Sequence, residues 1–251
     1  MSQPVRIGIA GLTGRMGREI AALAEADERV RLIGGIVRAD ADALDWPGLI
    51  VVTEPGDIIM EIDVLLDFTL PDATARISTA AAVAGVPLLC GVTGLGPSEI
   101  AALEEAAKII PVHWSRNLSL ALPLVADLVR TLSAALSDFD VEITEAHHRG
   151  KLESPSGTAL ILAEAVTEGR HQSLEDHAVF GRNGVSPRTS GDIGIHALRA
   201  GSLPGEHTIL FAGDDEELRI THRALSRRAF ARGAIEAALQ MPGRSPGLSR
   251  T

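Results

Sequence analysis

Apolar runs alternate with helical patterns over the first 117 residues, and this alternation limits the folds open to the chain. Short runs rich in branched apolar residues predict buried strands. They are Val5–Ala10, Val30–Val37, Val64–Phe68, Val86–Cys90 and Pro111–Trp114. Apolar residues between these runs recur at helical spacing, and Pro71 and Pro97 each open such a stretch. Strands with apolar interiors that alternate with helices form parallel sheets covered on both faces. The N-terminal part is therefore predicted to be such a sheet.

The pattern changes after Asn117. Helices are predicted over about 118–136 and 156–166, with an extended segment over 141–147. Three strand-like segments then follow without helices between them, at 193–199, 206–212 and 217–224. Consecutive strands indicate an open mixed or antiparallel sheet. We therefore expect a first domain of residues 1–117, completed by residues 228–251, and a smaller α+β domain of residues 118–227. Residues 242–251 are predicted to be a loose tail.

Composition excludes several classes of function. The chain has 23 Lys and Arg against 33 Asp and Glu, a net charge of −10, which argues against nucleic-acid binding. No apolar run reaches the roughly 18 residues of a membrane span, so no membrane partner is expected. The single Cys90 excludes an internal disulfide and fits a reducing compartment. We expect a cytoplasmic α/β protein.

A glycine-rich turn joins the first strand to the first helix, with the sequence Gly11-Leu12-Thr13-Gly14-Arg15-Met16-Gly17. Glycines at this place let the backbone approach a dinucleotide pyrophosphate, which the helix N-terminus attracts. The spacing is G-x-x-G-x-x-G, not the commoner G-x-G-x-x-G. A tight turn with close helix–sheet packing is the alternative. The strand–turn–helix context favours nucleotide binding in a Rossmann-type domain.

The end of the second predicted strand bears on which dinucleotide binds. NAD enzymes place a carboxylate there, on the ribose hydroxyls. This chain has Val37 and then Arg38, whose guanidinium can bind a 2′-phosphate through bidentate bonds. An exposed loop arginine is the alternative.

A second group of polar residues lies between Glu142 and Ala159. Alternate residues of an extended chain share a face, so His147 points with Glu145, whereas His148 points with Glu142. The diverging histidines and the lack of nearby thiols argue against a metal site. Cations at Arg149 and Lys151 precede a helix start at 155–158, where backbone N–H groups and hydroxyls are available. Together these features indicate a pocket for a small carboxylate or phosphate. A nicotinamide in one domain and a carboxylate pocket with proton donors in the other favour a reductase.

The segment 142–159 resembles the signature E-I-x-E-x-H-H-x-x-K-x-D-A-P-S-G-T-A of the 4-hydroxy-tetrahydrodipicolinate reductase (dihydrodipicolinate reductase) family. Further similarities follow in order along nearly the whole chain. They are residues 7–11, Gly14–Gly17, Asp67–Thr69, Gly91–Gly94, Asn117 with Ser119, Arg199–Gly201 and Gly205–Thr208. The chain departs from the family pattern at Glu153-Ser154, which replace Asp-Ala, at Val92, and at Trp114–Arg116.

The resemblance implies NAD(P)H-dependent reduction of a 4-hydroxy dicarboxylate with loss of water, in diaminopimelate and lysine biosynthesis, by a homotetramer. It implies that His147 is the catalytic acid/base and Lys151 the proton donor. Substrate carboxylates would be held by His148, Gly157 and Thr158. NADPH or NADH would contact Gly11, Leu12, Thr13, Gly14, Arg15, Met16, Arg38, Gly91, Val92, Thr93, Ser115, Arg116, Asn117 and Leu118. Another two-domain NAD(P)-dependent dehydrogenase, of the amino-acid type, and a non-catalytic dinucleotide sensor are the alternatives.

Overall fold

The computed structural model describes residues 3–39, 46 and 48–250. The chain divides into two units, one of residues 1–119 and 227–251 and the other of residues 120–226. Within the described ranges, no helix is long and apolar enough to cross a membrane.

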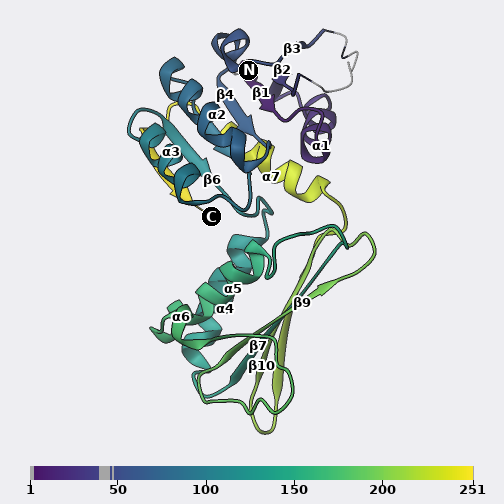
Figure 1. Cartoon of the computed structure of the whole chain (residues 1–251), viewed down its shortest axis with the longest axis vertical. Helices are drawn as coiled ribbons and strands as arrows, with labels where there is room; N and C mark the ends of the chain where they lie inside the picture. The colour runs from purple at the N-terminus through teal and green to yellow at the C-terminus, as the bar shows by residue number, and fades with distance from the viewer. Residues whose placement is uncertain (1–2, 40–45, 47, 251) are drawn as a thin grey trace. The chain divides into compact units, whose positions relative to one another are not determined.

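The first unit is built on a seven-stranded, fully parallel sheet of order β12-β6-β5-β4-β1-β2-β3 (Figure 1). Its strands are β1 (Val5–Ala10), β2 (Val30–Ile36), β3 (Ile50–Val52), β4 (Val64–Asp67), β5 (Leu88–Cys90), β6 (Pro111–Trp114) and β12 (Gly247–Arg250). Its helices are α1 (Arg15–Ala24), α2 (Pro71–Ala84), α3 (Pro97–Ala107), α7 (Arg228–Leu239) and the 3₁₀ turns η1 (Pro55–Asp57) and η2 (Ile59–Glu61).

Adjacent residues of the central strands pack into two different cores, which is why these strands are apolar throughout. Leu65 and Leu88 face a core with α2 and α3. Leu66 and Leu89 face a core with α1 and α7. The parallel sheet covered on both faces, predicted from sequence, is confirmed.

The second unit carries a five-stranded mixed sheet of order β11-β10-β7-β9-β8. Its strands are β7 (Asp140–His147), β8 (Ala178–Phe180), β9 (Ile193–Arg199), β10 (Glu206–Ala212) and β11 (Glu217–Arg223), and its helices are α4 (Leu122–Ala135), α5 (Gly157–Arg170) and α6 (Leu174–His177). Strands β10 and β11 run antiparallel to their neighbours, whereas β7, β8 and β9 are parallel. Helices α4 and α5 lie against one face (Figure 1), around a core that includes Phe211 and Leu162. The predicted mixed sheet is confirmed.

Several segments differ from the prediction. The supposed tail at 242–251 contains β12, which pairs in parallel with β6. Leu248 packs on the core, and Arg250 stacks over Trp114 with its guanidinium carbon 5.5 Å from the ring centroid. One apolar residue in a Gly/Ser/Pro-rich segment gave no periodicity from which to predict this strand. Helix α4 begins at Leu122 and not at residue 118, because Ser119 instead donates its backbone N–H to the Asn117 side chain. The short elements β3, β8 and α6 were also missed.

Candidate active site

The glycine loop follows β1 directly and leads into α1. Gly11 has a φ of +82°, and a Cβ there would lie 2.6 Å from the carbonyl oxygen of Phe68. The backbone N–H of Gly14 donates to the Gly11 carbonyl at 2.9 Å, which closes the turn. Gly14 is the N-cap of α1 and has no side chain with which to cap the first helical N–H groups. A pyrophosphate can take that place, so the loop fits a dinucleotide.

The predicted ribose side of this site begins where β2 ends. The backbone N–H of Val37 donates to the Val52 carbonyl at 2.9 Å, and the exposed Arg38 follows it. No carboxylate occupies position 37 or 38, so the repulsion that an NAD-selective site directs at a 2′-phosphate is missing from these two positions. Asp40 and Asp42, the nearest acidic residues that follow, lie outside the described residues.

The predicted nicotinamide-side residues come from the loops after β5 and β6. The backbone N–H of Ser115 donates to the Cys90 carbonyl at 3.0 Å, which ties the two loops together. The Ser115 hydroxyl donates to the Asn117 carbonyl at 2.8 Å, and the Trp114 indole donates to the Val92 carbonyl at 3.1 Å. These bonds place both predicted segments at the carboxyl ends of neighbouring strands, where open α/β sheets bind ligands.

Glu145 is the centre of the site in the second unit. It lies on β7 with 0% of its surface exposed and accepts four hydrogen bonds. His147 Nδ1 donates at 2.6 Å, the two terminal nitrogens of Arg199 at 2.8 Å each, and the backbone N–H of Ser156 at 3.0 Å. Burial alone would raise the pKa of Glu145, but the hydrogen bonds from His147 and Arg199 outweigh it and lower the pKa to about 2. The carboxylate is therefore ionised and accepts only.

The first turn of α5 is anchored to two strands. Ser156 is its N-cap: its hydroxyl accepts from the Ala159 N–H at 3.2 Å and is hydrogen-bonded to His207 Nε2 at 2.8 Å. His207 lies edge-on to His147, with ring centroids 5.1 Å apart. We call Glu145, His147, Ser156, Arg199 and His207 the Glu145 network. It positions the helix start that carries Gly157 and Thr158.

Lys151 lies in the loop between β7 and α5. Its backbone N–H closes a turn onto the His148 carbonyl at 3.1 Å. Its ammonium donates to Glu153 Oε1 at 2.5 Å, and only 15% of the lysine side chain is exposed. Burial raises the pKa of Glu153, but the bond from Lys151, a backbone N–H and the charges of Lys151 and Arg199 together outweigh it and leave that pKa below its usual value. Glu153, where the family signature has Asp, therefore holds the lysine ammonium through a salt bridge.

The sequence predicted that His147 shares a face of β7 with Glu145, and His148 with Glu142. Only the first of these two pairs is found. His147 and Glu145 are hydrogen-bonded, as expected. Glu142 instead contacts Arg182, Arg188 and His196. Strand β7 ends at His147, so the alternation that would place His148 with Glu142 stops before His148.

Comparisons with known proteins identify the family of the chain. The family described as "Dihydrodipicolinate reductase, N-terminus" matches residues 5–118, and its C-terminus counterpart matches residues 121–250. The chain belongs to the dihydrodipicolinate reductase family. It is 44% identical to the 4-hydroxy-tetrahydrodipicolinate reductase of Rubrobacter xylanophilus, over 97% of this chain and 95% of that protein. It is 42% identical to the one from Granulibacter bethesdensis, over 97% and 94%.

Solved structures share the fold. A dipicolinate-bound dihydrodipicolinate reductase from Paenisporosarcina sp. TG-14 superposes with a TM-score of 0.75 at 23% identity, over 98% of this chain and 97% of that one. A probable dehydrogenase from Thermotoga maritima superposes with a TM-score of 0.64 at 13% identity, over 98% and 91%. The predicted family, its two-domain α/β fold and its oxidoreductase class are thereby confirmed. The N-terminal domain is the dinucleotide-binding domain of a reductase that uses NADH or NADPH.

Three members of the Glu145 network, Ser156, Arg199 and His207, were given no functional role from the sequence. Arg199 and His207 belong to matched motifs, but both are more than 50 residues from Glu145 along the chain. Strand register brings them together. Antiparallel pairing places His207 opposite Glu145, and parallel pairing places Arg199 opposite His147. Ser156 was predicted only as part of a helix start. The periodicity of β7 could have shown which face needed cationic partners, but not which strands supply them.

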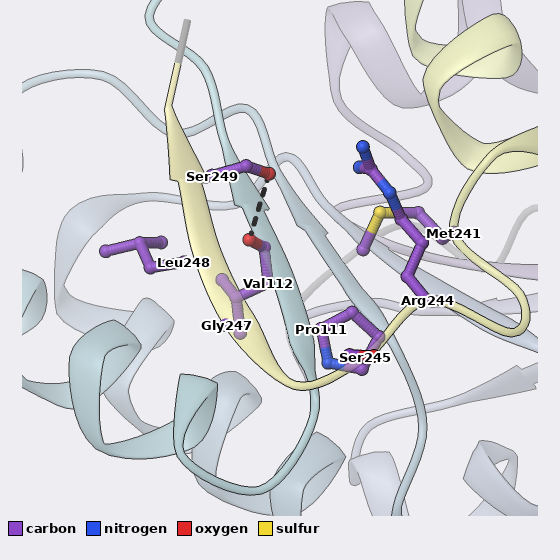
Figure 2. A pocket seen from close by; sticks show the side chains of 8 residues that line it. All are labelled: Pro111, Val112, Met241, Arg244, Ser245, Gly247, Leu248 and Ser249. Carbon is purple, nitrogen blue, oxygen red and sulfur yellow. Dashed lines mark hydrogen bonds between the residues drawn. The ribbon is translucent and has the colours of Figure 1, made fainter.

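A pocket of about 300 Å³ lies elsewhere in the first unit (Figure 2). It is lined by Pro111, Val112, Met241, Arg244, Ser245, Gly247, Leu248 and Ser249. Pro111 and Gly247 are the first residues of β6 and β12, so the pocket reaches the amino ends of these strands. Dinucleotides bind at the carboxyl ends. None of the predicted site residues lines this pocket. The cofactor is instead expected at the carboxyl ends of the strands.

Proposed function

We propose that the chain reduces 4-hydroxy-tetrahydrodipicolinate to tetrahydrodipicolinate with NADPH or NADH, with loss of water, as a step of diaminopimelate and lysine biosynthesis. The observation that carries this proposal is the second-unit site. It combines an imidazole paired with a buried carboxylate, an ammonium held by a glutamate, and a helix N-terminus. Family membership over nearly the whole chain and the names of relatives at 40–44% identity support the same reaction.

The glycine loop holds the cofactor in this proposal. Residues 11–16 would bind the pyrophosphate through backbone N–H groups at the start of α1, and Arg38 would lie by the adenosine ribose. Residues 91–93 and 115–118 would line the nicotinamide side. The bound cofactor supplies a hydride. The loop–helix geometry at Gly11 and Gly14 supports this assignment.

The proton chemistry falls to His147 and Lys151. Because Glu145 is ionised and can only accept, His147 must carry a proton on Nδ1, and Nε2 is the atom that takes up or gives up a proton. Lys151 is the proton donor, and its bond to Glu153 restricts where the ammonium can lie. Proton donation by a positioned side chain is the general acid catalysis that this reduction needs.

Binding of the dicarboxylate falls to the start of α5. The backbone of Gly157 and Thr158 opens the helix, where the dipole and the first N–H groups attract a carboxylate. His148, directly after β7, would hold another carboxylate oxygen. Dipicolinate, a planar dicarboxylate, is bound in the related Paenisporosarcina structure, which supports a dicarboxylate substrate here.

One experiment tests the reaction. Freshly generated 4-hydroxy-tetrahydrodipicolinate is added with NADPH or NADH, and loss of the absorbance of the reduced nicotinamide is followed. We expect consumption only when protein, substrate and cofactor are all present. A protein that binds the cofactor but consumes neither form would favour the sensor. Turnover of amino acids but not of this substrate would favour another dehydrogenase.

The assembly and the compartment are also proposed. We propose a homotetramer joined through the strands of residues 193–224, in the cytoplasm. Exposed apolar side chains on these strands and on β8, Leu198, Leu218 and Phe180, support an interface. Strands β8 and β11 are sheet edges, which assembly protects from wrong pairing. Light scattering at micromolar concentration checks this; a monomer would contradict it.

A further inference from the structure

His207 is a buried histidine to which the proposed reaction gives no role. It lies on β10 with 2% of its surface exposed. Its Nε2 is hydrogen-bonded to the Ser156 hydroxyl at 2.8 Å, and its ring stands edge-on to His147. Nδ1 is buried and has no hydrogen-bond partner within the described part of the chain. A residue that contacts both the proton-carrying ring and the N-cap of α5 is placed to link them.

The surroundings of His207 keep its ring uncharged. An imidazolium donates from both nitrogens, but only Nε2 has a partner. Burial, with smaller effects from the nearby His147, His222 and Lys151, lowers the pKa of His207 to about 3, although the charge of Glu145 acts in the opposite direction. A neutral ring beside His147 does not repel a proton on that residue.

Two separate paths connect His147 to the first turn of α5. The first passes through Glu145, whose two oxygens accept from His147 Nδ1 and from the Ser156 N–H. The second passes through His207, which contacts the His147 ring on one side and the Ser156 hydroxyl on the other. Glu145 also forms an ion pair with Arg199, so the first path runs through charged groups. The second path runs through the uncharged ring of His207.

The chain before β10 completes the enclosure of His147. A Cβ at Gly205 would lie 3.0 Å from His147 Nε2, so a glycine keeps this atom uncrowded. His147 is thereby held at Nδ1 by Glu145 and at its ring edge by His207, and Nε2 lies beside a residue without a side chain. Two residues at the start of one strand, Gly205 and His207, thus contact the same imidazole.

We propose that His207 is a positioning residue. It holds the N-terminus of α5 in a fixed position relative to the His147 ring and thereby determines how tightly the substrate carboxylate is bound. This rests on the proposed function, which places a carboxylate at Gly157 and Thr158. The Ser156 hydroxyl is the shared atom, since it serves both His207 and the Ala159 N–H. Without His207, the N-cap keeps its helical bond and its bond to Glu145 on β7, but it loses its anchor to β10.

The test compares His207→Leu, which cannot hydrogen-bond Ser156, with His207→Gln, which can. The main readout is the Kd of pyridine-2,6-dicarboxylate, measured by titration calorimetry on the full chain, with the KM and kcat for substrate beside it. We expect His207→Leu to weaken binding on the order of 2- to 12-fold, the equivalent of one net hydrogen bond. We expect His207→Gln to stay within about twofold of the parent. His222→Leu, which changes the histidine opposite His207 on β11, is the matched control and should leave Kd unchanged.

A double-mutant cycle with Ser156→Ala tests the specific contact. If His207 acts through the Ser156 hydroxyl, the Kd of pyridine-2,6-dicarboxylate for the double variant His207→Leu/Ser156→Ala should be no higher than the higher of the two single-variant values. Additive losses, or a folded His207→Leu variant with the Kd of the parent, would overturn the proposal. The parent assay separates this from the proposed function. Absence of turnover by the parent refutes the reaction, whereas the Kd series judges His207 by itself.

Discussion

The two candidate sites, each of which we propose binds an anion, are built in different ways. The glycine loop of the first unit works through its backbone, with a turn at Gly11 and a helix start at Gly14 that lie next to each other in the sequence. The site of the second unit also contains a helix start, at Gly157, but buried side chains hold it in place, and the Glu145 network draws these from β7, β9, β10 and the N-cap of α5. The glycine loop is thus local in sequence, whereas the second-unit site depends on the register of three strands.

This difference determines how each site fails. A backbone cradle loses affinity when a side chain obstructs it, but its surroundings remain satisfied. A buried side-chain network leaves charged groups without partners when one member is removed, which costs stability as well as function. Substitutions in the two units therefore separate effects on binding from effects on folding.

The largest effect is expected at Lys151, the proposed proton donor. Lys151→Ala should lower kcat by roughly 10²–10⁴-fold, the range for a lost general acid. His147→Gln should also lower kcat, and the double variant should lose much less than the product of the two effects, because both groups act in one step. Initial rates at saturating substrate, with far-UV circular dichroism to verify folding, measure this.

The control is the only other lysine of the chain, Lys108, which forms an exposed ion pair with Glu105. Lys108→Ala should leave kcat unchanged. A folded Lys151→Ala variant within a few-fold of the parent would show that Lys151 is not the donor.

The second effect is on stability and belongs to Glu145. Glu145→Gln removes the charge that faces Arg199, which is 21% exposed, and should lower the free energy of unfolding by about 3–5 kcal/mol, as for a broken buried pair. Urea denaturation at pH 7 measures it. Glu217→Gln, which breaks the exposed pair with Arg219, is the matched control and should leave the unfolding midpoint unchanged. If Glu145→Gln and Glu217→Gln unfold at the same urea concentration, the Glu145 network does not stabilise the fold as proposed.

The pH dependence of unfolding sharpens the same comparison. The pKa of Glu145 is lowered from 4.5 to about 2 in the folded chain, so its stabilisation is complete above pH 4.5 and is lost as the pH falls towards 2. The pKa of His207 is lowered from 6.5 to about 3, so its neutral form stabilises above pH 6.5 and this stability is lost as the pH falls towards 3. His207→Gln should flatten the upper part of this profile, and Glu145→Gln the lower part. Parent-like slopes in both variants would refute these directions.

The same contrast explains what could be predicted from the sequence. Strand β1 and the loop after it were predicted correctly, because local spacing alone determines a strand, a turn and a helix start. The Glu145–His147 contact was also accessible, since alternation along one strand places both on one face. Arg199 and His207 could not be given roles, because register between distant strands brings them to Glu145. Strand β12 was missed because its stability comes from pairing with β6 and not from its own pattern.

A smaller effect is expected at the helix start of the second unit. Gly157→Val should obstruct the approach of a carboxylate to the first turn of α5 and raise the substrate KM about 10- to 150-fold, the equivalent of about 1.5–3 kcal/mol for charge-assisted bonds. The Kd of pyridine-2,6-dicarboxylate should rise in parallel. The KM for the cofactor, whose loop lies in the other unit, serves as the internal control and should not change. A substrate KM equal to that of the parent would remove Gly157 from the site.

The smallest effect concerns the choice of cofactor. Arg38 is exposed, so a bond from its guanidinium to a 2′-phosphate should contribute under ~1 kcal/mol, or less than about fivefold in affinity. Because positions 37 and 38 carry no carboxylate to repel that phosphate, we expect NADPH to be used at least as well as NADH, with NADH still accepted. Salt screens exposed charges, so the preference should shrink as ionic strength rises. The ratio of kcat/KM for the two cofactors in the parent, in Arg38→Ala and in Arg31→Ala tests this. Arg31 is an exposed arginine of β2 and provides the matched control. Only Arg38→Ala should move the ratio towards NADH, and a ratio that neither substitution moves would show that Arg38 does not recognise the phosphate.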